Sequence, residues 1–120
     1  MLRFLFTCLI LMSASSVRAE IIDIENAAVA SLSASGAAVI DIRTAPEWEE
    51  TGIVPGSRLL TFFDERGNAD PAAWLAKVKG FAKPADPVIV ICRSGRRSKA
   101  ASQYLSEQAG YAKVYNVKHG

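Results

Sequence analysis

Cys92 has neighbours that suit nucleophilic chemistry. It comes directly after the apolar run 88–91, and the residues that follow it are Arg93, Ser94, Gly95, Arg96, Arg97 and Ser98. A loop that leads into a helix directs successive backbone N–H groups at one point, and the helix dipole adds about half a positive charge there. Gly95 permits backbone angles that other residues resist. Because donated hydrogen bonds and fixed positive charge favour the thiolate, the pattern predicts a reactive cysteine in an anion-binding loop.

Metal and nucleotide sites are not indicated by the sequence. Residues 20–120 hold one cysteine, Cys92, and one histidine, His119, which are too few ligands for a zinc site. We interpret His119 as a surface or turn residue. Neither a Walker motif nor a dinucleotide-binding glycine pattern is present. We therefore expect no metal and no cofactor.

The first 19 residues have the pattern of a cleaved signal peptide. A short start with Arg3 is followed by the apolar run 4–12, and residues 17–19 (Val-Arg-Ala) resemble the small-x-small site that signal peptidase reads. The run is about half of the ~20 apolar residues that span a bilayer, so we expect no stable membrane anchor. A buried N-terminal helix is the alternative interpretation. We expect an exported protein, periplasmic or secreted, whose domain is residues 20–120.

The charge of residues 20–120 is balanced. The whole chain has 14 basic and 12 acidic side chains, and two of the basic ones, Arg3 and Arg18, lie in the first 19 residues. Such a balance gives no reason to expect nucleic acid or an anionic membrane as a partner. Half of the 120 residues are hydrophobic, which is enough for a core, and the length fits one domain. An exported domain with Cys92 as its one thiol cannot form an internal disulfide.

Apolar runs of strand length alternate with helical segments. The expected strands are residues 37–40, 59–63, 88–91 and 113–117, and the first and third are apolar throughout, as in strands buried on both faces. The expected helices begin or end at typical capping residues: 24–32 after Asp23, 44–52 with a capping box of Thr44 and Glu47, 70–78 with Asp70 and Pro71, and 98–109 before Gly110.

This alternation predicts one α/β domain with a mainly parallel central sheet flanked by helices. Ligands of such sheets bind beyond the carboxyl ends of the strands. Cys92 follows the most hydrophobic of the expected strands, so it should lie at that edge.

The sequence resembles the rhodanese-like family over nearly all of residues 20–120. The resemblance rests on residues 39–44 with 47–48, on the Gly-Ile-x-Pro-Gly-like stretch 52–57, and on residues 90–98. The last of these is the most specific, because the family's loop of six residues begins with the catalytic cysteine. The resemblance implies a single rhodanese-like domain.

The resemblance implies a thiosulfate sulfurtransferase as well. Cys92 would take sulfane sulfur from a small anionic donor such as thiosulfate, hold it as a persulfide, and pass it to a thiophilic acceptor. The loop N–H groups would stabilise the persulfide. The substrate-binding candidates are Arg93, Ser94, Gly95, Arg96 and Arg97, and the supporting positions are Asp41, Arg43 and Ser98. Of these, Asp41 and Arg43 are expected to order the neighbouring loop.

The sequence departs from the family pattern in two places. Val54 stands in the Gly-Ile-x-Pro-Gly-like stretch, which lacks the histidine often found beside it. The family's terminal Gly-Gly-Ile-x-x-Trp pattern is represented only by residues 119–120. We therefore expect the family's C-terminal helix to be absent, and the apolar side chains of strand 113–117 to be partly open.

Two other functions stay open. A cysteine phosphatase or arsenate reductase of similar fold uses Cys-x5-Arg, whereas here Arg97 comes one place early and Ser98 stands at the arginine position. A tetrahedral phosphate needs the larger ring of N–H groups, so this function is disfavoured. The second alternative is a non-catalytic persulfide carrier or binding module that serves a protein partner.

Overall fold

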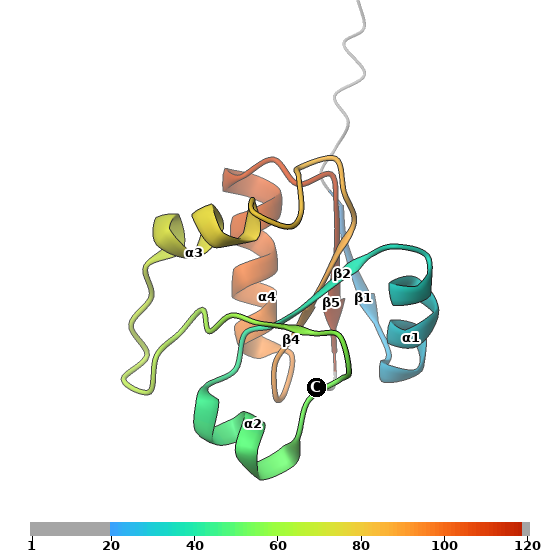
Figure 1. Cartoon of the computed structure of the whole chain (residues 1–120). Coiled ribbons are helices and arrows are strands. Elements are labelled where there is room, and N and C mark those ends of the chain that lie inside the picture. The colour runs from blue at the N-terminus through green and yellow to red at the C-terminus, as the bar shows by residue number, and fades with distance from the viewer. Residues whose placement is uncertain (1–19, 119–120) are drawn as a thin grey trace, which may run out of the picture.

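The computed structural model describes residues 20–118, which form one five-stranded sheet with helices on both faces (Figure 1). The expected signal peptide, residues 1–19, and residues 119–120 lie outside the described part. The strands are β1 (Glu20–Ile24), β2 (Ala38–Asp41), β3 (Arg58–Leu59), β4 (Val88–Ile91) and β5 (Lys113–Val117). The helices are α1 (Asn26–Ala34), α2 (Ala45–Thr51), α3 (Pro71–Val78) and α4 (Arg96–Gln103), which continues into a π-helical turn, η1 (Tyr104–Gln108).

All neighbouring strands are parallel, and their order is β1-β5-β4-β2-β3. The predicted α/β domain with a parallel sheet is thereby confirmed. Strand β4 lies in the middle, between β2 and β5, so its carboxyl end is flanked by the carboxyl ends of two other strands. This is the edge at which open parallel sheets bind ligands.

The alternation of side chains along β4 builds two cores. Val88 and Val90 point to the face covered by α3 and α4, where Trp74 and Leu105 are also buried. Ile89 and the next-but-one residue, Ile91, point to the opposite face, which α1 covers (Figure 1). A strand buried on both faces reads as a continuous apolar run, as the sequence predicted.

Strand β1 was not predicted. We expected Asp23 to begin a helix over residues 24–32, but residues 20–24 extend along β5 and the helix begins at Asn26. Three isoleucines in five residues suit a strand, and the five-residue parallel register with β5 outweighs the local signal of Asp23. The chain therefore has one more strand, and Asp23 has a different neighbourhood from the one expected.

The predicted strand over 59–63 is shorter in the structure. Strand β3 holds only Arg58 and Leu59, and Phe63 makes an isolated antiparallel bridge to Ala69. The predicted helix over 98–109 begins two residues earlier, at Arg96, and its second half is π-helical. Both changes leave the order of the elements as predicted.

The apolar side chains of β5 are more deeply buried than expected. Val114 is 0% and Val117 is 1% exposed, and only Tyr115 is half-buried. The expectation of open apolar surface on this strand is wrong for the two valines. Each valine lies in a different one of the two cores, so helices on both faces of the sheet cover them.

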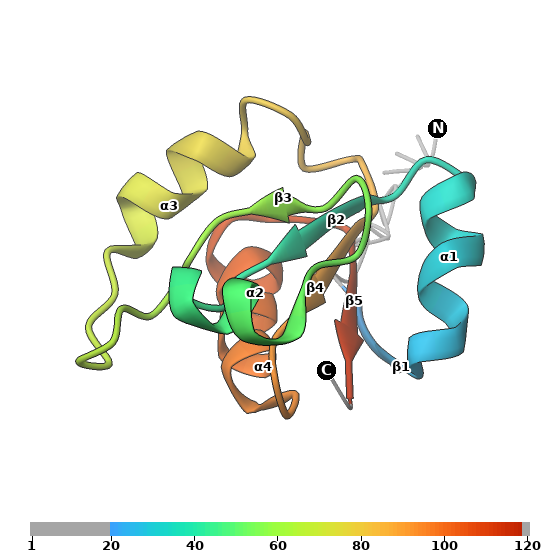
Figure 2. The ribbon, with the colours of Figure 1, turned by 60° about the horizontal axis from the view of Figure 1, so that its bottom comes forward.

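Two predicted helix starts are confirmed. Thr44 and Glu47 form the capping box of α2, with the Thr44 N–H donating to a Glu47 carboxylate oxygen at 3.4 Å. Asp70 caps α3 by accepting from the Ala73 N–H at 3.2 Å, and proline follows at the first helical position. Figure 2 shows α2 beside the loop that leads from β4 to α4. The capping box therefore also fixes Glu47 close to the predicted site.

Candidate active site

Cys92 lies at the carboxyl end of β4, fully buried, with its sulfur inside the loop that follows. Its Sγ accepts hydrogen bonds from the backbone N–H groups of Gly95 at 3.1 Å and Ser98 at 3.2 Å. The thiol itself lies 3.2 Å from the Ser98 hydroxyl oxygen, to which it donates. A sulfur that accepts from two backbone N–H groups at a helix N-terminus is stabilised when it carries negative charge.

Gly95 holds the loop in this shape. It sits immediately before α4 with φ of 84°, in the left-handed region that favours glycine. A Cβ at this position would lie 2.4 Å from the carbonyl oxygen of Lys118, at the end of β5. Glycine is therefore required both by the backbone angle and by the close approach of a second strand.

The Ser98 hydroxyl links Cys92 by hydrogen bonds to β5 and, through β5, to β1. It donates to the Asn116 Oδ1 in β5, and the Asn116 Nδ2 donates to the Asp23 Oδ1 in β1 at 3.1 Å. Ser98 and Asn116 are buried, whereas Asp23 is exposed. A continuous series of side-chain hydrogen bonds thus joins the sulfur to the surface.

Arg97 forms an ion pair with Glu47. Its two terminal nitrogens donate to the two Glu47 carboxylate oxygens, each at 2.7 Å. This bidentate pairing lowers the pKa of Glu47 from 4.5 to about 2 and raises the pKa of the Arg97 guanidinium. The pair fastens α2 to the start of α4, so Arg97 serves here to hold the loop in place.

Asp41 and Arg43 fasten the end of β2 to the end of α2. The Arg43 guanidinium contacts the Asp41 carboxylate at 2.8 Å and donates to the Thr51 hydroxyl at 2.5 Å and the Gly52 carbonyl at 2.7 Å. Its bond with Asp41 raises the pKa of Arg43. Both side chains are buried, and their partners are structural groups of the neighbouring turn.

The other loop side chains face outward. Arg93, Ser94 and Arg96 are exposed. Arg93 lines a hollow of about 150 Å³ beside Glu47 and Arg43, and the two others line a separate, open depression of about 430 Å³ beside Asp23 and Lys118. Exposed guanidinium groups can attract and hold an oxyanion.

Comparisons with known proteins show the family of the chain. A family model described as "Rhodanese-like domain" matches residues 25–120. The chain belongs to the rhodanese-like domain family. It is 32% identical over 113 residues to "Thiosulfate sulfurtransferase 18" of Arabidopsis thaliana, covering 90% of this chain and 81% of that protein. Both findings support a sulfurtransferase-type or persulfide-related role.

Solved structures show the same fold. The Rv0390 protein of M. tuberculosis superposes with a TM-score of 0.62 at 24% identity, covering 82% of this chain and 77% of its own. A rhodanese-like domain protein of Staphylococcus aureus gives a TM-score of 0.60 at 21% identity, covering 84% and 86%. The rhodanese-like fold of this chain is therefore shared with solved proteins over most of its length.

Three side chains of the rhodanese-like site were missed by sequence reasoning. Glu47 was identified as a capping residue and as part of the family resemblance but not as a partner of Arg97, Asp23 was identified as the cap of a helix, and Asn116 was not singled out. One signal was available, because an asparagine between apolar residues of a parallel strand needs a buried hydrogen-bonding partner. The pairing of Glu47 with Arg97 joins residues 50 positions apart and has no local signal.

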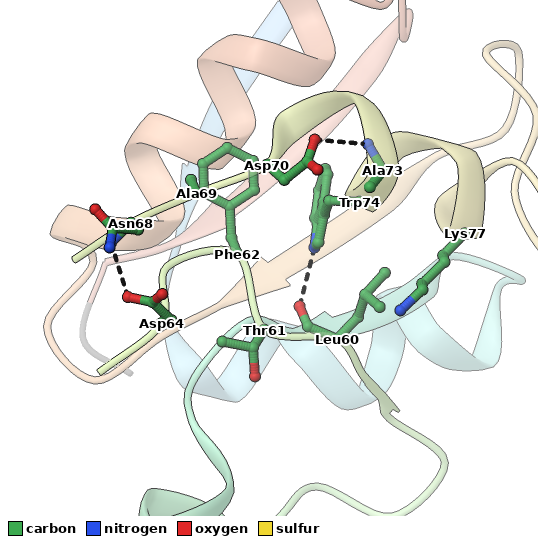
Figure 3. A pocket seen from close by; sticks show the side chains of 10 residues that line it. All are labelled: Leu60, Thr61, Phe62, Asp64, Asn68, Ala69, Asp70, Ala73, Trp74 and Lys77. Carbon is green, nitrogen blue, oxygen red and sulfur yellow. Dashed lines mark hydrogen bonds between the residues drawn. The ribbon is translucent and has the colours of Figure 1, made fainter. Parts of the chain in front are cut away.

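Another hollow in this rhodanese-like domain lies away from Cys92. It measures about 410 Å³ and is lined by α3 and the segment that precedes it (Figure 3). The Trp74 Nε1 donates to the Leu60 carbonyl at 2.9 Å, and the Asp64 carboxylate accepts from the Asn68 N–H at 2.8 Å. Its polar groups thus pair largely with the protein itself.

The described residues do not gather three or more histidine, cysteine, aspartate or glutamate side chains in a metal-binding arrangement. None of the helices between residues 20 and 118 has the length and apolar character needed to cross a bilayer.

Proposed function

We propose that the protein is a sulfurtransferase in which Cys92 carries the sulfur. The Cys92 thiolate attacks the outer sulfur of thiosulfate, a new S–S bond forms, and sulfite leaves with the electron pair of the broken bond. A thiophilic acceptor such as cyanide or a thiolate then attacks the outer persulfide sulfur, and the Cys92 thiolate leaves. No external oxidant or reductant is needed, and each step conserves charge.

The observation that carries this proposal is the pair of backbone N–H groups on the Cys92 sulfur. Gly95 and Ser98 donate to Sγ at 3.1 and 3.2 Å. Donors fixed in place before reaction stabilise developing negative charge without reorganising. They favour the thiolate needed for attack, and they also favour it as the leaving group in the second step.

The arginines divide between two tasks in this proposal. Arg97 is paired with Glu47, so it holds α2 against the loop. Arg93 and Arg96 are exposed, each lines a different hollow beside the loop, and they are the residues proposed to bind the sulfonate oxygens of the donor. Cys92 is fully buried, so the donor reaches Sγ only when the surrounding side chains move aside.

The position six places after Cys92 argues against phosphatase chemistry. There Ser98 is buried and hydrogen-bonded to the sulfur, where a Cys-x5-Arg enzyme has its phosphate-binding arginine. Arg97, the nearest arginine, turns to Glu47. A phosphoryl group above Cys92 would therefore lack the guanidinium that grips it.

Mass spectrometry after incubation with thiosulfate tests the proposal. The full chain should gain the mass of one sulfur atom and then form thiocyanate with cyanide. Cys92→Ser should abolish both the adduct and the turnover, whereas the matched control Cys8→Ser should retain both. An adduct that forms without thiocyanate would support the persulfide carrier instead, and turnover by the Cys92→Ser variant would refute covalent catalysis by this residue.

We also propose that the protein is exported and that the mature chain begins at Glu20. The proposal rests on the charged start, the apolar run 4–12 and the Val-Arg-Ala sequence at 17–19. Strand β1, Glu20–Ile24, lies within the proposed mature chain. The intact mass of protein recovered from the periplasmic or secreted fraction tests this, and a chain that keeps residues 1–19 there would contradict it.

A further inference from the structure

The hydrogen bonds that lead from Cys92 through Ser98 and Asn116 to Asp23 have a fixed direction. A carboxylate only accepts hydrogen bonds, so Asn116 must turn its Nδ2 toward Asp23, at 3.1 Å. Its Oδ1 then faces the Ser98 hydroxyl, which donates to it. The lone pairs of the Ser98 oxygen are left facing the sulfur, 3.2 Å away, where they accept the thiol proton.

This direction opposes the effect of the loop. The backbone N–H groups of Gly95 and Ser98 favour the Cys92 thiolate, whereas a hydroxyl oxygen that faces the sulfur with its lone pairs favours the thiol. The Ser98 hydroxyl has one proton, and Asn116 Oδ1 and a Cys92 thiolate compete for it. Whatever holds the Asn116 amide in place therefore influences the protonation of the nucleophile.

We propose that Asp23 and Asn116 are positioning residues that hold the Ser98 hydroxyl away from Cys92 and so keep a larger share of the resting nucleophile as thiol. The inference rests on the proposed function, in which Cys92 is the nucleophile. The thiolate is the form of cysteine that oxidants attack, so this arrangement protects the sulfur between turnovers. When the thiolate forms, the hydroxyl turns toward it and the bond to Asn116 is given up.

Other charged groups lie near the loop that holds Cys92, and Arg97 among them interacts electrostatically with this cysteine. They come from the elements that meet at the carboxyl edge of the sheet: Asp23 in β1, Asp41 at the end of β2 and Arg43 after it, Glu47 and Glu50 in α2, Arg93, Arg96, Arg97 and Lys99 in the loop and α4, and Lys118 after β5. A test of the proposal must separate the orientation of Asn116 from the plain charge of Asp23.

Titration of the Cys92 thiolate by its ultraviolet absorbance provides the test. Asp23→Asn replaces the acceptor-only group with an amide, so Asn116 is free to turn over and donate to Ser98, whose hydroxyl then donates to the sulfur. We expect the titration midpoint to fall by about 0.5–1 pH unit, the value of one redirected hydrogen bond. Each curve is measured on the full chain and corrected with the matching Cys92→Ser protein, which removes the signals of tyrosine and Cys8.

A double-mutant cycle separates orientation from charge. In a Ser98→Ala background no hydroxyl remains to be redirected, so Asp23→Asn should leave the midpoint unchanged. If Ser98→Ala does not fold, the Asp23→Asn shift is measured again in about 1 M salt, where the Debye length is about 3 Å and an exposed charge is screened. Orientation predicts that the shift persists in salt.

Three results would overturn the proposal: a midpoint that stays or rises in Asp23→Asn, an equal shift in the Ser98→Ala background, or a shift that salt removes. Titration needs no sulfur transfer, so its outcome is independent of the proposed function. A protein that shows the expected shift but forms no persulfide would keep the positioning role and lose the sulfurtransferase role.

Discussion

Gly95→Ala should damage the loop more than its size suggests. The residue has φ of 84°, and an L-residue in this region costs about 1–2 kcal/mol. The added Cβ would also lie 2.4 Å from the Lys118 carbonyl oxygen, closer than carbon and oxygen can approach, and the obstacle is backbone directly after β5. Either the loop or the end of β5 must move, so we expect a total loss of unfolding free energy of about 2–4 kcal/mol.

Gly67→Ala is the matched control. Gly67 has nearly the same backbone angle, φ of 80°, but an added Cβ would meet nothing within 4 Å. The unfolding free energy of this variant should fall only by the cost of the left-handed backbone angle, about 1–2 kcal/mol. The difference between the two variants in urea unfolding therefore measures the contact between Gly95 and Lys118.

Gly95→Ala should also slow the loading of sulfur onto Cys92. The Gly95 N–H donates to the Cys92 sulfur, and a shift of the loop weakens this hydrogen bond. Loss of one such donor costs about 10²–10³-fold in enzymes with preorganised anion sites. Single-turnover loading from thiosulfate measures this at a temperature where the variant is folded. Equal stability of Gly95→Ala and Gly67→Ala, with unchanged loading, would show that the contact with β5 does not shape the loop.

Two further predictions concern single contacts. Glu47→Gln should lower the unfolding free energy by about 1–2 kcal/mol at pH 7, and not by more, because solvent weakens a partly exposed ion pair. The pKa of Glu47 is lower in the folded protein than in the unfolded chain. The stability that the pair contributes is therefore present above about pH 4.5 and is lost as the pH falls toward about 2. Urea unfolding at pH 7 and pH 3, with Glu50→Gln as control, should show a smaller difference at the lower pH, and a constant difference would contradict the assignment. Tyr111→Phe removes a buried hydroxyl that donates to the Ala82 carbonyl at 2.5 Å. We expect a loss of about 1–3 kcal/mol and a melting temperature lower by several degrees, and an unchanged melting temperature would show that the bond contributes nothing.

The alternation of elements and the location of Cys92 followed from the sequence for simple physical reasons. The apolar run of β4 is long enough for one buried strand, and Cys92 directly follows it. The caps at Thr44 and Asp70 depend on residues only three positions away, so local reasoning finds them. The sequence therefore indicates the edge of the sheet at which chemistry is proposed.

What the sequence could not indicate depends on residues far apart in the chain. Strand β1 pairs with β5 across more than 90 residues, and Asp23 inside it is also a plausible helix cap when only its neighbours in the sequence are considered. The partner of Arg97 is Glu47, which local pattern assigns to a helix cap alone. The hydrogen bond from Asn116 to Asp23 depends on the pairing of β1 with β5, which the sequence did not predict.

The pairing of β1 with β5 also determines how the domain responds to mechanical tension. The first and last strands of the described chain are neighbours and run parallel, with Glu20 opposite Lys113 and Ile24 opposite Val117. A force that pulls the start of β1 and the end of β5 apart acts along the strands, so the hydrogen bonds between them share the load and break together. A domain stretched by its two ends should therefore resist extension until this strand pair shears, and then lose the Asp23 end of the site in the same event.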